Sequence, residues 1–357
     1  MKVLAINSSA RVGDVSKTEI ILDSLIEGMR DAGAEVEIIN LAKKKIKYCI
    51  GCYTCWTKTP GKCVHKDDMS KEIYPKLLEC DLCILATPLY HFTVNAQMKT
   101  FIERTLPMLE PFFIMQDGVT MHPRRHELPS TVVISVAGFP EESVFDQLKS
   151  YINFVFKDKF QDKLVAEIYR TSCEFLRRPP TRYGDILDAT VQGGRELVKN
   201  MKISPETMTR IKRPITDFEK VSPIANLTWE TCIKEGVILG KWQKRKLIAR
   251  PDSIETFISL IYMAFNVKGA GDAEVSMQLR FTGQVEGQCY VIIDKGKITA
   301  SPGSIKNPDL TINTPFEVWM DIMTQKSDGA KMFLEGKYTV EGNAEILMKM
   351  KDYFGEN

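Results

Sequence analysis

The stretch Lys2-Val3-Leu4-Ala5-Ile6-Asn7-Ser8-Ser9-Ala10-Arg11, residues 2–11, decides the fold of the first part of the chain. A short apolar run ends in a polar loop, and a segment with helical periodicity begins near residue 17. Apolar runs bounded by polar or turn residues are typical of strands buried on both faces of a parallel sheet. The stretch therefore predicts a strand, a loop and a helix in that order.

The same pattern recurs four more times. The apolar runs that predict strands are 3–6, 36–39, 82–86, 132–136 and 164–168. The segments with helical periodicity are 17–32, 70–79, 96–109, 143–156 and 184–200. This alternation predicts a doubly wound α/β sheet with the flavodoxin-type strand order 2-1-3-4-5, in which ligands bind outside the carboxyl ends of the strands.

Length and composition indicate a globular protein of more than one domain. A chain of 357 residues exceeds the size at which one core stops growing, so we expect two domains. The 48 basic and 46 acidic residues leave a formal charge of +2, which gives no indication of a nucleic-acid partner. The first apolar run is too short for a signal peptide, and no segment approaches the ~20 apolar residues of a membrane span. We therefore expect a cytoplasmic location.

The loop after the first strand carries groups suited to an anion. Its hydroxyls, Arg11 and the free amides at the helix start favour a phosphate, because the helix dipole attracts negative charge and the guanidinium is a forked donor. Alternatively, Ser16 only caps the helix and Arg11 is solvated. Gly13 is the one glycine in this loop, so both the G-x-G-x-x-G fingerprint and the P-loop pattern are missing. A mononucleotide phosphate is the better expectation.

A second loop, 86–92, carries an aromatic cluster before the third helical segment. Pro88, Tyr90, His91 and Phe92 offer a stacking plane and backbone donors for a flat heteroaromatic ring. Alternatively, Tyr90 or Phe92 packs in the core or between subunits.

Four of the nine cysteines are crowded into the loop after the second strand. Cys49, Cys52, Cys55 and Cys63 have the spacing C-x2-C-x2-C-x7-C. In a reducing compartment such spacing indicates metal or redox chemistry rather than disulfides. Three thiolates at steps of three can converge on an iron–sulfur cluster, with the fourth ligand from farther along. Metal-free thiols and a zinc ion held by all four thiolates are the alternatives.

The remaining cysteines and the nearby histidine have simpler interpretations. His65 is interpreted as a loop residue rather than a ligand. The cysteines outside the loop are interpreted as small hydrophobic residues: Cys80, Cys83, Cys173, Cys232 and Cys289.

The segments 7–18, 86–104 and 135–139 resemble the flavin-contacting segments of the NAD(P)H-dependent FMN reductase and iron–sulfur flavoprotein families. The resemblance covers residues 2–202 and implies a flavodoxin-like FMN-binding domain with NAD(P)H as the electron donor. The implied phosphate contacts are Ser9, Arg11, Ser16, Lys17 and Thr18. The implied contacts to the flavin ring are Pro88, Leu89, Tyr90, His91, Phe92 and Asn95, with Ala137 and Gly138 lying against it.

Two further details of this resemblance concern the loops. The chain reads Ser8-Ser9-Ala10-Arg11 where Gly-Ser-Pro-Arg is commoner in the family, and Ser16-Lys17-Thr18 where Asn-Thr is frequent. The four cysteines match the compact cysteine motif of the iron–sulfur flavoproteins, and Asp67-Asp68-Met69 is a familiar ending to it. The resemblance thus implies that Cys49, Cys52, Cys55 and Cys63 ligate a 4Fe–4S cluster.

Beyond residue 202 the pattern changes. Residues 203–250, with three prolines, predict a connector whose basic run is interpreted as a solvated face: Lys241, Lys244, Arg245, Lys246 and Arg250.

Residues 251–357 predict a smaller α+β domain with a helix at 253–265, strands at 274–281, 288–293, 297–301 and 309–313, then helices. Segments 302–312, 315–322 and 329–343 resemble the sterol-carrier-protein domain, which implies an apolar tunnel that accepts lipids. The seven methionines of this part suit such a tunnel and an ordinary core equally well.

Two functions remain open. The first is an FMN oxidoreductase that takes a hydride at the flavin and passes electrons through a cysteine-bound cluster to a redox partner or a small-molecule acceptor. The second is a lipid-binding protein whose flavodoxin-like part senses redox state without turnover. No catalytic acid or base is evident, and hydride transfer needs mainly positioning. We expect a homodimer or a higher homo-oligomer.

Overall fold

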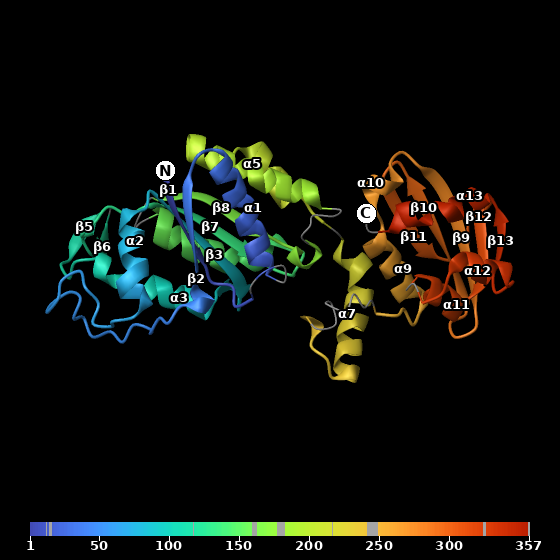
Figure 1. Ribbon diagram of the computed structural model, residues 1–357, viewed down its shortest axis with the longest axis horizontal. Coiled ribbons are helices and arrows are strands. Elements are labelled where there is room, and N and C mark those ends of the chain that lie inside the picture. The colour runs from blue at the N-terminus through green and yellow to red at the C-terminus, as the bar shows by residue number, and fades with distance from the viewer. Residues whose placement is uncertain are drawn as a thin grey trace. The chain divides into compact units, whose positions relative to one another are not determined.

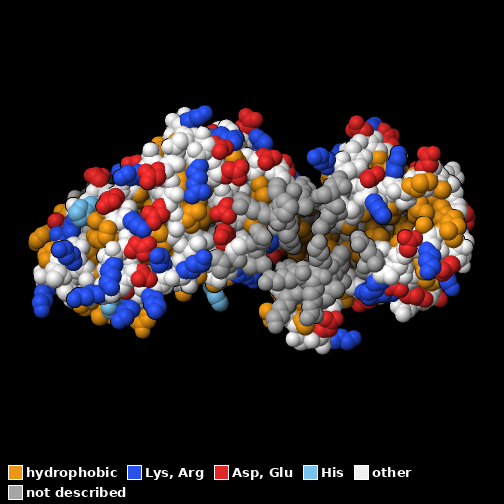
Figure 2. All heavy atoms as spheres, in the orientation of Figure 1, with side chains coloured by type: hydrophobic (Ala, Val, Ile, Leu, Met, Phe, Trp, Pro, Cys, Tyr) orange, Lys and Arg blue, Asp and Glu red, His pale blue; other side chains and the backbone are white. Residues whose placement is uncertain are grey.

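The computed structural model describes residues 1–11, 13, 16–116, 118–158, 163–176, 183–215, 217–240, 249–323 and 326–355. The chain divides into two compact units, Met1–Ile215 and Thr216–Asn357. Both units carry interspersed basic and acidic side chains over the described part of the face shown in Figure 2. Within the described ranges, each helix is too short or too polar to cross a membrane.

The first unit is built on a parallel sheet with the predicted strand order. Its strands are β1 (Lys2–Asn7), β2 (Glu35–Asn40), β3 (Leu82–Tyr90), β7 (Ser130–Val136) and β8 (Leu164–Arg170). They lie in the order β2-β1-β3-β7-β8, which is 2-1-3-4-5 among the main strands, and the short β4 (Thr93–Val94) pairs antiparallel with the end of β3. Alternate residues of β1 enter two different core clusters, Val3 and Ala5 one, Leu4 and Ile6 the other. Burial on both faces explains why the strands are continuous apolar runs.

Helices cover both faces of this sheet (Figure 1). One core cluster includes α1 (Lys17–Asp31), α5 (Gly184–Asn200) and α6 (Pro205–Lys212). The other includes α2 (Tyr74–Glu79), α3 (Ala96–Glu103) and α4 (Asp146–Asn153). The backbones of α1 and α5 touch, since a Cβ added at Gly28 would lie 1.7 Å from the Val191 carbonyl oxygen and one at Gly194 would lie 2.0 Å from that of Leu25.

Some predicted helices are interrupted. The segment predicted at 70–79 is a π-helical turn, Met69–Ile73, followed by α2. The segment predicted at 96–109 ends as an α-helix at Glu103, and a 3-10 turn, Leu106–Met108, follows with Pro107 inside it. Proline cannot donate an i→i−4 hydrogen bond, which stops the helix there. A hairpin of β5 (Ile114–Gln116) and β6 (Val119–Met121) was not predicted.

The described part of the region 203–250 includes α6 and α7, one packed in each unit. α6 lies in the first unit, where Ile211 joins the core cluster of α1 and α5. α7 (Phe218–Glu235) lies in the second unit, where Ile224 packs in a cluster with Leu260. In the basic run, Arg250 forms an ion pair with Asp321, and the other four basic residues lie outside the described part of the chain.

The second unit is a separate α+β domain. Its sheet has the order β11-β10-β9-β12-β13, in which β9 and β12 are parallel and the other pairs are antiparallel. The strands are β9 (Glu274–Thr282), β10 (Gly287–Asp294), β11 (Lys297–Pro302), β12 (Leu310–Pro315) and the unpredicted β13 (Thr339–Gly342). The helices described beyond residue 249 are α9 (Ile254–Ala264), α10 (Val267–Ala270), α11 (Phe316–Met323), α12 (Gly329–Leu334), α13 (Ala344–Met348) and α14 (Met350–Phe354). Phe257, Phe281 and Phe316 meet at the centre of its core.

Candidate functional site

The loops after β1 and β3 meet at the carboxyl edge of the first unit's sheet. The Asn95 side chain joins them, because its Nδ2 donates to the Ser8 carbonyl at 2.6 Å while its Oδ1 accepts from the Met98 amide and caps α3. The Ser8 amide in turn donates to the Ala86 carbonyl at 2.9 Å. Asn95 therefore fixes the first loop against the start of α3.

In the first loop the structure brings together part of the predicted phosphate site. Ser16 caps α1 by accepting from the Glu19 amide, and its hydroxyl donates to Ser9 Oγ at 2.8 Å. Both serines and Thr18 are buried. Sequence reasoning offered capping as the simple alternative for Ser16, and the capping hydrogen bond is present. Residues 12, 14 and 15 of this loop lie outside the described residues.

The two cations of this loop point in different directions. The Arg11 side chain is 62% exposed, and its Nη1 lies 3.9 Å from Glu174 Oε1. Lys17 is buried and its Nζ donates to the Leu176 carbonyl at 2.7 Å. Arg11 is therefore the cation that solvent reaches most easily here.

The second loop is a tight hairpin turn that holds aromatic rings at the surface. Tyr90 of β3 pairs with Thr93 of β4, so His91 and Phe92 alone form the turn, and their φ angles are 47° and 62°. Positive φ at both positions defines a type I′ turn, for which Asn-Gly is the usual sequence. The Tyr90 and Phe92 rings are 47% and 51% exposed, so neither packs in the core of this chain. Pro88 and Leu89 belong to β3 itself.

The loop after β7 is held by β8. The Ala137 amide donates to the Arg170 carbonyl at 2.9 Å, and its carbonyl accepts from the Cys173 amide at 3.0 Å. Ala137 is buried, and the adjacent Gly138 is exposed. The third segment predicted to lie against the flavin is therefore anchored to the neighbouring strand.

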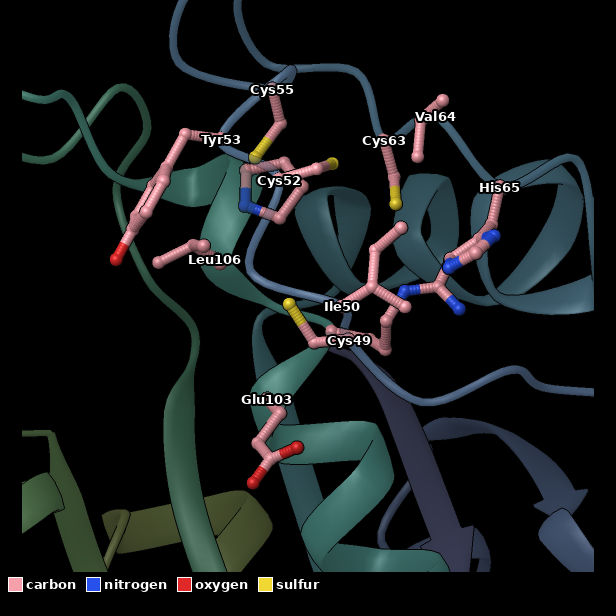
Figure 3. Close-up of a pocket in the computed structure, with 12 residues that line it drawn as sticks. Cys49, Ile50, Cys52, Tyr53, Cys55, Cys63, Val64, His65, Glu103 and Leu106 are labelled. Atoms are coloured by element: carbon pink, nitrogen blue, oxygen red, sulfur yellow. The ribbon is translucent and has the colours of Figure 1, made fainter.

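The four predicted cysteines line a single pocket (Figure 3). The pocket is open to solvent, and its cavity volume is only about 20 Å³. The labelled sulfur atoms surround a common space in the close-up. Cys52 is exposed and Cys55 is buried, while Cys49 and Cys63 are intermediate. Within the described ranges, no group of three or more Cys, His, Asp or Glu side chains is arranged to hold a metal ion.

The thiols of this pocket differ in acidity. Thr54 Oγ1 donates to Cys52 Sγ at 3.3 Å, and this hydrogen bond lowers the pKa of the Cys52 thiol. Burial raises the pKa of the Cys55 thiol, and the neighbouring Cys63, Cys49 and Cys52 raise it further. Cys52 is thus the more acidic of these two thiols.

A buried ion pair that sequence reasoning missed lies beside the pocket. Arg104 Nη1 and Nη2 donate to the two carboxylate oxygens of Asp67 at 2.7 and 3.0 Å, and the side chains are 1% and 7% exposed. Burial acts to raise the pKa of Asp67, but the hydrogen bonds and charge of Arg104 outweigh it and hold that pKa well below its ordinary value. A sequence signal existed, since Met98, Phe101 and Arg104 follow one another at steps of three and therefore share the buried face of α3.

Arg104 and His65 also line the cysteine pocket, where Arg104 Nε and His65 Nε2 are buried. The Arg104 guanidinium interacts there with the Cys63 thiol, so a thiol of the pocket already serves as its neighbour. His65 lies in the loop, as predicted, and its side chain faces the pocket.

Two parts of the chain match known protein families. Residues 1–118 match the family model of the NADPH-dependent FMN reductases, and residues 277–355 match that of the SCP-2 sterol transfer family. An iron-sulfur flavoprotein of Archaeoglobus fulgidus is 45% identical over 108 residues, which are 30% of this chain and 46% of that protein. An iron-sulfur flavoprotein of Methanocaldococcus jannaschii is 36% identical over 109 residues, 30% of this chain and 52% of that protein. The chain thus spans about half the length of these relatives.

Among solved structures, an NAD(P)H:quinone oxidoreductase from Methanothermobacter marburgensis has 14% identity and a TM-score of 0.41, with 57% of this chain and 97% of that chain covered. The predicted resemblances are confirmed over parts of their extent: residues 1–118 match the NADPH-dependent FMN reductase model, with iron-sulfur flavoproteins as relatives, and residues 277–355 match the SCP-2 sterol transfer model.

Proposed function

We propose that the first unit is an FMN-dependent oxidoreductase that takes a hydride from NAD(P)H and passes single electrons through a cluster held by Cys49, Cys52, Cys55 and Cys63. One observation carries this proposal. The start of α3 is tied to the first loop through Asn95, and its end, at Glu103 and Arg104, lines the cysteine pocket. Eight helical residues span only about 12 Å. The two sites are therefore neighbours along one helix.

The loops carry groups of the kinds that would contact FMN. Ser9, Ser16 and Arg11 would bind the phosphate at the start of α1, where the dipole and free amides favour an anion. The exposed rings of Tyr90 and Phe92, with His91 between them, would flank the flavin ring, and Ala137 and Gly138 would lie against it. FMN, when bound, would supply a centre that accepts one hydride and releases its two electrons one at a time. The chain's own part is to bind, orient and shield that centre.

The cysteine pocket supplies four thiols of the kind that ligate an iron–sulfur cluster. Arg104 lines the same pocket, and its guanidinium is a donor of the kind that the sulfur atoms of a cluster accept. Free thiols and a zinc ion held by all four thiolates are the competing interpretations.

The test is an anaerobic preparation assayed for FMN, iron and acid-labile sulfide, and then for bleaching of the flavin absorbance by NADH and NADPH. We expect FMN, about four irons per chain and reduction by at least one of the two donors. Cys52→Ala should lose iron and keep FMN, whereas the matched control Cys80→Ala, outside the pocket, should keep both. Less than one iron per chain with normal FMN would leave free thiols as the correct interpretation.

The second unit supports a second candidate function. Its match to the SCP-2 sterol transfer family favours binding of an apolar ligand such as a fatty acyl chain or a sterol. If this part alone functions, the full chain should take up a fluorescent acyl probe saturably while NADH and NADPH leave the flavin oxidised. Reduction of the flavin together with probe uptake would assign both activities to one chain.

A further inference from the structure

We propose that Arg104, clamped by Asp67, closes the cysteine loop and sets the reduction potential of the group that this loop holds. The inference rests on the proposed cluster and assigns new roles to two residues outside its ligand set. Arg104 is a positioning residue in this scheme.

The first step is that the pair closes the base of the loop. Lys47 lies just before the first cysteine and Asp67 lies just after the last. Arg104 Nη1 donates both to the Lys47 carbonyl and to Asp67, while the Lys47 amide donates to Asp67 Oδ2 at 3.0 Å. Asp68 adds a second bond of this kind, since its carboxylate accepts from the Lys45 amide at 2.7 Å. The two ends of the loop are therefore held together around one guanidinium.

The second step is that Arg104 faces the pocket and Asp67 does not. Arg104 is among the residues lining the pocket, whereas Asp67 is not. Arg104 Nη1 and Nη2 donate to Asp67, and the same guanidinium interacts with the Cys63 thiol. The carboxylate thus occupies one edge of the guanidinium and leaves the rest of it beside the thiols.

The third step is electrostatic. A reduced cluster carries one more negative charge than an oxidised one, so a nearby cation and an N–H donor both favour reduction. Interactions between charges are strong where water is excluded, and the Arg104 side chain is 1% exposed. Arg104 lines the pocket and Asp67 does not, so the positive charge of Arg104 affects the reduction potential more than the negative charge of Asp67 does. Removing the cation should lower the potential, and removing the carboxylate charge should raise it.

The experiment is an anaerobic redox titration of Arg104→Met, Arg104→Lys and Asp67→Asn beside the wild type, with iron content and thermal unfolding measured on each. We expect Arg104→Met to disfavour reduction at least tenfold, which is 59 mV for one electron, and Asp67→Asn to shift the potential the opposite way. Arg104→Lys keeps the positive charge but loses the two-pronged guanidinium donor. Its reduction potential should therefore lie between those of Arg104→Met and the wild type. Arg195→Met is the matched control, because it breaks an exposed Arg–Asp pair with Asp31. It should leave the potential unchanged.

The outcomes separate this inference from the proposal beneath it. A wild-type chain with less than one iron removes the cluster and this inference together. A wild-type chain with four irons whose potential is the same in Arg104→Met and Asp67→Asn removes the inference alone. If Arg104→Met takes up no iron, the reduction potential of Asp67→Asn is the deciding measurement. An unchanged or lowered potential in that variant overturns the role of Arg104.

Discussion

Replacing one glycine where α1 crosses α5 should destabilise the first unit far more than replacing its neighbour. A Cβ at Gly28 would lie 1.7 Å from the Val191 carbonyl oxygen, about half of an ordinary contact distance, and one at Gly194 would lie 2.0 Å from that of Leu25. Neither obstacle is a flexible side chain, so the two helices must separate. Overpacking of this kind costs about 3 kcal/mol or more, against a gain of about 1 kcal/mol in helix propensity. We therefore expect Gly28→Ala and Gly194→Ala each to lose at least about 2 kcal/mol of unfolding free energy.

Gly193, one residue away on α5, provides the control. A Cβ there would meet only the terminal methyl groups of Ile203 and Ile211, each at 3.4 Å. Gly193→Ala should therefore be neutral or should stabilise the chain by up to about 1 kcal/mol. The contrast between residues 193 and 194 depends on the helix crossing alone, since both substitutions add the same methyl group to the same helix.

Native-state hydrogen exchange is the suitable assay. A chain of two units need not unfold in a single transition, so a global melting curve would combine the unfolding of both units in one signal. Exchange measured on peptides from α1, α5 and the strands between them reports the first unit separately. If Gly28→Ala and Gly194→Ala protect these peptides as well as Gly193→Ala does, the close crossing of α1 and α5 is wrong.

Two further predictions concern the loops of the candidate site. Arg11→Ala with Ser16→Ala should release FMN on gel filtration and cost about 1 kcal/mol of stability through the lost cap of α1, and full retention of FMN would refute the phosphate assignment. Asp67→Asn should cost about 3 to 5 kcal/mol at pH 7, because it leaves Arg104 buried without its counter-charge. The pKa of Asp67 is depressed in the folded chain, so its stabilisation is present above its unfolded pKa of about 3.9 and is lost as the pH falls through the folded pKa. The gap between wild type and Asp67→Asn, measured by urea unfolding, should therefore narrow below about pH 4, and a gap that widens there would contradict this account.

The sequence predicts those parts of the fold that local pattern determines. The five parallel strands are recognisable as apolar runs because both faces of the sheet are buried. The helix α5 spans the predicted residues 184–200. The strands β5 and β13 were missed because three or four residues carry too little periodicity. The Arg104–Asp67 pair joins residues 37 positions apart, and only the folded chain brings them together. The cysteine spacing indicated one shared site, and the pocket has all four thiols, but spacing alone could not reveal which buried donors face it.

At the turn formed by His91 and Phe92, the residues that favour stability differ from those that favour FMN binding. Both residues have left-handed backbone conformations that glycine adopts freely and that cost other residues about 1 kcal/mol each. A chain with glycine at both positions would be more stable, yet it would lose the rings that the proposed flavin contacts require. Directed evolution for thermal stability should therefore accept glycine here readily, and the same variants should release FMN. Higher stability and higher FMN affinity therefore require different residues at this hairpin, and selection for stability alone will lower the affinity for FMN.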